Sequence, residues 1–249
     1  MKILKFQKKP NGKYRVFLDD GREFIYYEEV ILQYNLLLTK EIKEEDLLTI
    51  HNTNLEYDVY YVALHSINSR FKSIYETREF LKKKEYPSDL IEKAIEKLIQ
   101  QGYLNDRLFA KSYIHTQMAI SSHGPIHIEN ELYQKKVDAS IVSEEILVFD
   151  EELQKEKIKK IIEKELKRNH TRGGLVLKQK IIDGLKQQGY PYEVIIQVIG
   201  DYHFGNDIDL AKKEYEKLYK KYSRKYEGYE LENKIREKMF QKGLVYEEE

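Results

Sequence analysis

Two histidines four residues apart, His123 and His127, have the types and the spacing that best fit metal binding in this sequence. Two imidazoles at this spacing can chelate a transition metal when both lie on one face of a helix. Here Gly124 and Pro125 interrupt any helix between them, and we identify no third ligand nearby. We therefore predict no metal site and no cofactor.

Other catalytic sites are excluded by the residue types present. The chain has no cysteine, which excludes disulfides, thiol nucleophiles and cysteine-ligated zinc. Gly173 and Gly174 lack the adjacent lysine and hydroxyl residue of a phosphate-binding loop. Paired carboxylates such as Asp19 and Asp20 stand at turns or helix starts, where they act as capping groups. We predict no catalytic residue and no enzyme activity.

Basic side chains are concentrated in three segments. Residues 70–84 contain six lysines and arginines against two acids, and residues 155–186 contain eleven against four. In residues 212–226, lysines alternate with tyrosines. Such segments suit a phosphate backbone or an acidic protein groove, and the alternative is a solvated helix face. Nine residues are our candidates for partner binding: Arg70, Lys72, Arg78, Lys82, Lys83, Lys84, Lys167, Arg168 and Arg172.

The composition is that of a folded and mostly helical protein. Of 249 residues, 41% are hydrophobic and 35% are charged, and only four are prolines. This length favours more than one core. Lys plus Arg and Asp plus Glu number 43 each, so the chain lacks the overall positive charge that binds DNA unspecifically. Any nucleic-acid contact must rely on local patches.

The hydropathy of the chain argues against a membrane protein. No apolar run approaches the roughly 18–20 residues that span a bilayer. The N-terminus is too charged for a signal peptide. We expect a cytoplasmic monomer without membrane contact.

Residues 3–27 alternate between apolar and polar side chains in the manner of strands. Asn11-Gly12 and Asp20-Gly21 interrupt the alternation, and such pairs supply the positive φ angles of tight hairpin turns. The pattern predicts a three-stranded meander, followed by short helices at 28–34 and 44–50. Residues 1–54 then form a small β-rich head that ends at a boundary over 51–54.

From residue 57 onward, apolar residues recur at helical spacing, and the pattern repeats. Leu81, Leu132 and Leu185 occupy equivalent positions, in steps of 51 and 53 residues. One apolar face per helix means that each unit must stack on its neighbours. We predict a mainly α fold in which tandem three-helix repeats form an elongated curved array, and the alternative is an unrelated series of amphipathic helices. The predicted repeats are 57–106, 107–150 and 151–202, followed by C-terminal helices at 207–249 with a truncated fourth copy.

The sequence resembles the RecX family of bacterial regulatory proteins. The resemblance covers residues 57–200, and the head and C-terminal extension are similar to the longer members from low-GC Gram-positive bacteria. It departs from the family pattern where a glycine is frequent after the basic run: this position is Glu85 in the first repeat, Lys136 in the second and Gly189 in the third. The stretches that carry the resemblance are Arg70-Phe71-Lys72-Ser73, residues 79–84 and 95–98, Gly102-Tyr103-Leu104-Asn105-Asp106, Gly124-Pro125 and Glu131-Leu132.

The resemblance implies a non-enzymatic regulator whose partner is the RecA recombinase. Members of the family are thought to lie in the groove of the RecA filament on single-stranded DNA, where they inhibit strand exchange and ATP hydrolysis. This role belongs to recombinational DNA repair and the SOS response. A weak contact with single-stranded or double-stranded DNA is compatible with it. The alternative is a helical-repeat protein that binds nucleic acid directly.

Overall fold

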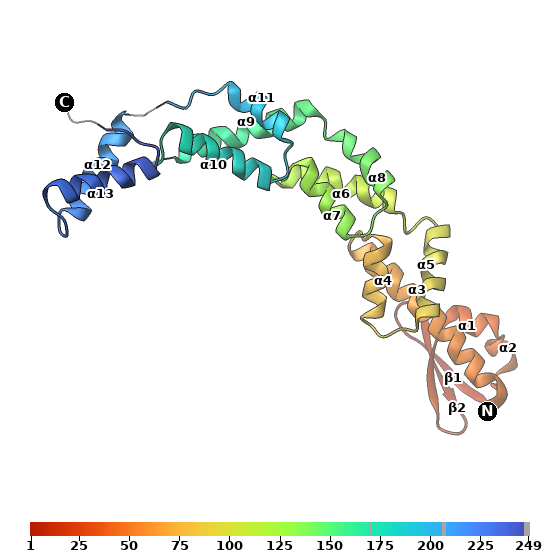
Figure 1. Cartoon of the computed structure of the whole chain (residues 1–249). Coiled ribbons are helices and arrows are strands. Elements are labelled where there is room, and N and C mark those ends of the chain that lie inside the picture. The colour runs from red at the N-terminus through yellow and green to blue at the C-terminus, as the bar shows by residue number, and fades with distance from the viewer. Residues whose placement is uncertain (170, 206–207, 247–249) are drawn as a thin grey trace. The chain divides into compact units, whose positions relative to one another are not determined.

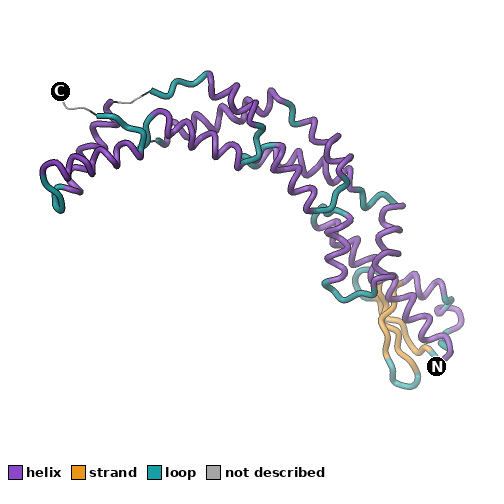
Figure 2. The backbone as a smooth tube through the Cα atoms, in the orientation of Figure 1, coloured by secondary structure: helices purple, strands orange, loops and turns teal. Residues whose placement is uncertain are grey.

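The computed structural model describes residues 1–169, 171–205 and 208–246, which form one small sheet followed by helices (Figures 1 and 2). The predicted mainly α fold with an N-terminal sheet is confirmed. These residues divide into two compact units, of which the first is Met1–Phe109 with Lys135–Val137 and the second is the remainder. Among them, every helix is too short or too polar to cross a bilayer. The predicted loop residues Asn206 and Asp207 lie outside the described residues, as does the end of the predicted fourth copy beyond Tyr246.

The predicted meander is confirmed. Its strands are antiparallel in the order β1-β2-β3. The hairpin glycines Gly12 and Gly21 have φ angles of 69° and 85°, which explains why a glycine follows Asn or Asp at each turn. Helix α1 follows directly, as predicted, and a 3-10 turn (Glu44–Asp46) precedes α3. The elements of this region are β1 (Ile3–Lys8), β2 (Lys13–Leu18), β3 (Glu23–Tyr27), α1 (Glu28–Gln33), α2 (Leu36–Thr39) and α3 (Leu47–Ser69).

Helix α3 continues through residues 51–54, where the sequence predicted a boundary after the head. The predicted boundary is absent because two of these polar residues, Thr53 and Asn54, hydrogen-bond to the head. The Asn54 side chain accepts from the Tyr27 backbone N–H at 2.9 Å and donates to the Ile25 carbonyl at 3.2 Å. Thr53 shares a 2.8 Å hydrogen bond with the Tyr34 hydroxyl. The N-terminal half of α3 therefore packs on the head and its C-terminal half on α5.

The rest of the described chain is helical, and its core register is the one predicted. Leu81, Leu132 and Leu185 expose 0%, 0% and 1% of their surface. Periodic burial of this kind holds a helix in place through its apolar face. The helices are α4 (Ile74–Lys82), α5 (Ser88–Gln100), α6 (Asp106–Ile120), α7 (Pro125–Gln134), α8 (Ala139–Glu145), α9 (Glu151–Arg168), α10 (Gly174–Gln187), α11 (Tyr192–Gly200), α12 (Ile208–Tyr222) and α13 (Gly228–Gln241). A 3-10 turn (Ile146–Val148) follows α8.

The corner within each helix pair is a left-handed residue. Glu85, Lys136 and Gly189 have φ angles of 62°, 57° and 84°, and Gly243 after α13 has 68°. These are the aligned positions of the three repeats, together with the residue that ends α13 in the proposed fourth copy. A left-handed residue after a helix satisfies its last carbonyls and reverses the chain. The aligned residues of the repeats therefore share the same left-handed backbone conformation.

Three of these four corners, all except the one at Glu85, also receive a hydrogen bond from the segment that opens an earlier helix pair. The acceptor is always the carbonyl of the residue before the left-handed one. The same backbone contact therefore recurs at these three corners. The three bonds are Ser73 Oγ to Lys135 O at 3.0 Å, Gly124 N to Gln188 O at 2.7 Å and Gly173 N to Lys242 O at 2.9 Å.

Candidate interaction surfaces

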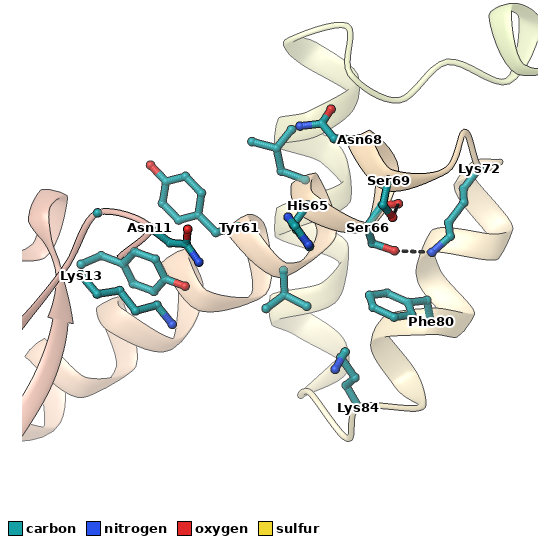
Figure 3. A pocket seen from close by; sticks show the side chains of 14 residues that line it. Asn11, Lys13, Tyr61, His65, Ser66, Asn68, Ser69, Lys72, Phe80 and Lys84 are labelled. Carbon is teal, nitrogen blue, oxygen red and sulfur yellow. Dashed lines mark hydrogen bonds between the residues drawn. The ribbon is translucent and has the colours of Figure 1, made fainter. Parts of the chain in front are cut away.

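A cleft of the first unit lies between α3, α4 and the turn before β2 (Figure 3). Its volume is about 760 Å³. Two of the nine predicted binding residues, Lys72 and Lys84, line it, and Phe80 of α4 lies close to both. The other lining residues are Asn11, Gly12, Lys13, Tyr27, Tyr61, Val62, Leu64, His65, Ser66, Asn68 and Ser69.

The Phe80 ring lies between two cations. The Lys72 ammonium is 4.3 Å from the ring centroid and the Lys84 ammonium is 5.4 Å from it. Lys72 also donates to the Ser66 hydroxyl, the bond drawn in Figure 3. Partial burial, and then the charge of Arg70, lower the pKa of Lys72 below its usual 10.5. An ammonium held in this way, on a ring and a hydroxyl, can attract a carboxylate or a phosphate.

The start of α4 holds this cation in position. Ser73 caps the helix by accepting from the Glu76 backbone N–H at 3.0 Å, and the Glu76 carboxylate accepts from the Ser73 backbone N–H at 3.2 Å. This reciprocal capping box fixes the chain one residue after Lys72. Glu76 also forms a 2.6 Å ion pair with Lys135. Lys72 is therefore on a rigid helix start.

The other predicted residues of segment 70–84 differ in the contacts that their side chains make. Arg78 forms a two-point ion pair with Glu92 of α5, with nitrogen–oxygen distances of 2.7 and 2.8 Å. This pair joins α4 to α5, so the role of Arg78 is structural. Lys82 pairs with Glu79 at 3.0 Å on the same helix. Lys83 is exposed and lines a shallow groove.

The same shallow groove includes Arg70, Lys72 and Phe80. The structure thus gathers four of the six predicted basic residues around Phe80, namely Arg70, Lys72, Lys83 and Lys84, and leaves Arg78 and Lys82 outside this group. We call these five residues the Phe80 surface. Of the predicted basic cluster, four residues belong to it.

The remaining three predicted residues lie in the second unit. Lys167 and Arg168 are exposed in the last turn of α9, where cations stabilise the partial negative charge of a helix end. Arg172 follows in the loop before α10 and lines a separate groove with Leu175 and Gln241. The nine candidates therefore belong to two groups in different units.

Lys13 was not predicted, although it lines the main cleft. Its ammonium is 4.5 Å from the Tyr27 ring centroid and 3.0 Å from an Asp58 oxygen. Nothing in the local sequence distinguishes it from the other lysines of the head. Only the tertiary contact of Lys13 with Asp58 of α3 brings it to the cleft.

A second chemical cluster lies in the second unit, at the start of α7. The rings of His123 and His127 are 3.8 Å apart between centroids, although Gly124 and Pro125 separate them. Glu131 supplies the third ligand that we did not identify in the sequence, and its carboxylate is 3.8 Å from His127 Nε2. One ligand atom from each of the three residues lies within 4.8 Å of the others. The helix break does not separate the imidazoles, because His123 folds back over the first turn.

Comparison with known proteins finds relatives of this chain along nearly its whole length. Two family models match, the first three-helix domain of RecX at residues 60–98 and its second three-helix domain at 105–145. The regulatory protein RecX of Listeria monocytogenes serotype 4a is 30% identical over 99% of this chain and 94% of its own length. That of Halalkalibacterium halodurans is 29% identical over 98% and 95%. A crystal structure of regulatory protein RecX aligns with a TM-score of 0.68 and 26% identity, over 81% of this chain and 99% of its own.

Proposed function

The chain belongs to the RecX family of regulatory proteins, and we propose that it binds the RecA filament on single-stranded DNA and inhibits or tunes it. The affected activities are ATP hydrolysis and strand exchange, in recombinational DNA repair and the SOS response. The observation that carries the proposal is the similarity to regulatory proteins named RecX over nearly the whole length of both chains. In this proposal the protein acts in the cytoplasm, as a monomer, and without catalysis of its own.

The mechanism that fits the surfaces is steric and electrostatic. The Phe80 surface offers cations beside an aromatic ring, a combination suited to acidic side chains of a protein groove. Partly buried Lys72 is screened less by solvent than the exposed lysines, so its attraction to a carboxylate is stronger. Lys167, Arg168 and Arg172 form a second contact in the same proposal. A regulator attached at two such points hinders the subunit changes that accompany ATP turnover.

The direct test is titration of the purified protein into DNA-dependent ATP hydrolysis by RecA from the same organism. Replacing Lys82, Lys83 and Lys84 by glutamate is expected to raise the half-inhibitory concentration at least about tenfold, because three favourable charges become repulsive. The matched control reverses three exposed lysines of the head, namely Lys2, Lys5 and Lys8. Circular dichroism checks that both variants keep their helices.

Inhibition by the triple variant equal to that of the parent would remove the 82–84 segment from the interface. Loss of inhibition in the control with reversed Lys2, Lys5 and Lys8 as well would show that inhibition depends on overall charge and not on this segment. Absence of any effect of the parent protein on RecA would refute the proposed function itself.

Direct binding of nucleic acid is the second candidate. It is favoured by the same surface, since a ring flanked by lysines can stack on a base and neutralise a phosphate. The two candidates differ in salt dependence, because binding to DNA alone weakens steeply as salt rises. Tight binding to naked single-stranded DNA, without tighter binding to RecA filaments, would favour this second candidate.

A further inference from the structure

Two imidazoles and one carboxylate come together at the start of α7, away from the basic surfaces. We propose that His123, His127 and Glu131 form a binding site for a divalent transition-metal ion, with Zn²⁺ the best fit. One ligand atom from each residue lies within 4.8 Å of the other two. This proposal rests on the cluster alone and is independent of the function proposed above.

The geometry is close to that of a bound ion. His127 and Glu131 are one helical turn apart, and His127 Nε2 is 3.8 Å from a Glu131 oxygen. His123 precedes the helix and places its ring 3.8 Å from that of His127, at an angle of 40°. In a tetrahedral site with zinc bonds of 2.0–2.1 Å, the ligand atoms lie about 3.4 Å apart. The 3.8 Å between His127 Nε2 and the Glu131 oxygen is close to that spacing.

Two atoms of the cluster have no other partner. Nδ1 of His123 and Oε2 of Glu131 are buried, and neither has a hydrogen-bond partner among the described residues. Buried polar atoms in native proteins nearly always have one. A bound cation satisfies lone pairs on both residues at once, and this second observation is independent of their spacing.

The donor set indicates which ions suit the site. Two nitrogens and one oxygen match Zn²⁺ and its first-row neighbours, whereas Ca²⁺ and Mg²⁺ prefer oxygen ligands alone. Zn²⁺ has no electronic preference for a particular geometry, which favours it where the ligands are not ideally placed. The fourth coordination position is left for water or for a side chain of a partner.

The site is built on the contact between the second and third predicted repeats. Gly124 donates to the Gln188 carbonyl at 2.7 Å, and Ile126 donates to the Gly189 carbonyl at 3.1 Å. A Cβ placed on Gly189 would lie only 2.4 Å from the His127 backbone nitrogen. A metal ion on His123 and His127 would tie the loop before α7 to the helix and so stabilise this contact.

The test is calorimetric titration of ZnCl₂ into the full-length protein without a polyhistidine tag. We expect one ion per chain and a rise in Tm of about 5 °C or more at a hundredfold excess over Kd. Glu131→Gln and His123→Ala should each weaken binding at least about tenfold with unchanged circular dichroism. The control is His115→Ala, an exposed histidine of α6, which should bind like the parent. Co²⁺ provides a second readout, because its visible absorption reports imidazole coordination.

Absence of stoichiometric Zn²⁺ binding by the parent protein would overturn the proposal. Undiminished affinity in both ligand variants would also overturn it, since the ion would then be held elsewhere. If His115→Ala weakened binding as much as His123→Ala, the site would not be the one proposed.

Discussion

The corners of the first and third helix pairs have the same backbone conformation but different surroundings. Glu85 and Gly189 are both left-handed, with φ angles of 62° and 84°. Glu85 is exposed, whereas Gly189 lies against the backbone of His127. A left-handed turn accepts a residue with a side chain at a moderate energetic cost. The third corner requires glycine because the backbone of His127 approaches Gly189 closely. The exposed first corner has no such neighbour among the described residues, which explains why it can have Glu85 at a position where the family often has glycine.

The tyrosines that follow the first and third corners, Tyr86 and Tyr190, differ in the same way. The Tyr86 hydroxyl donates to an Asp58 oxygen at 2.6 Å, and the same carboxylate also accepts from Lys13 and Tyr27. Tyr190 exposes only 2% of its surface, and its hydroxyl is buried with no hydrogen-bond partner among the described residues. Burial raises the pKa of Tyr190 to about 12. The first corner is thus held by polar contacts and the third by close packing.

The largest effect should come from Gly189→Ala. The new Cβ would meet the His127 backbone, and the residue would also carry the cost of a left-handed angle. We expect a loss of about 3 kcal/mol in the free energy of unfolding. Urea unfolding followed by circular dichroism measures it.

The matched substitution at the other corner is Glu85→Ala, which changes neither the backbone cost nor any close contact. It should alter the unfolding free energy by no more than about 0.5 kcal/mol. Equal losses in the two variants would show that the corners do not differ as described.

A smaller and pH-dependent effect is expected from Asp58→Asn. Burial opposes ionisation of Asp58, but the bonds from Tyr86, Lys13 and Tyr27 outweigh it, so its pKa lies below the usual 3.8. A carboxylate with a lowered native pKa stabilises the fold above its unfolded pKa, and this contribution disappears as pH falls through the native value. The variant should lose about 2 kcal/mol at pH 7.

The measurement is the difference in unfolding free energy between parent and Asp58→Asn from pH 7 down to pH 2. This difference should begin to shrink below about pH 4, where the carboxyl of the unfolded chain becomes protonated, and should disappear as pH falls through the lower native pKa. A difference that stays constant over the whole range would mean that the charge of Asp58 does not stabilise the first corner.

Removing the two hydroxyls should have a smaller effect than Asp58→Asn. Tyr86→Phe should cost about 1 kcal/mol, because Asp58 loses a donor. Tyr190→Phe removes a buried hydroxyl that has no partner, so stability should stay unchanged or rise slightly. Thermal unfolding of the two variants side by side measures both changes in stability. A larger loss of stability in Tyr190→Phe than in Tyr86→Phe would contradict the proposed difference between the two corners.

Much of the fold followed from local patterns, and part of the interaction surface did as well. The meander and the buried register of Leu81, Leu132 and Leu185 are both present as predicted. The charge count of residues 70–84 pointed to the segment that contributes all five residues of the Phe80 surface. It did not separate Arg78, whose partner Glu92 lies on the next helix. Charge alone does not reveal which cations are already neutralised by ion pairs.

The sequence by itself determined the type of each element and which of its faces is buried, because both depend on periodicities of two or 3.6 residues. The tertiary structure alone decided the continuation of α3 past Asn54, the partners of Asp58 and the approach of His123 to Glu131. The bonds that hold Asn54 and Asp58 join residues separated by 27 to 45 positions. The meeting of His123 with Glu131 depends on how the chain reverses around Gly124. No local pattern encodes the contacts of Asn54 and Asp58, since they exist only when separate segments pack together.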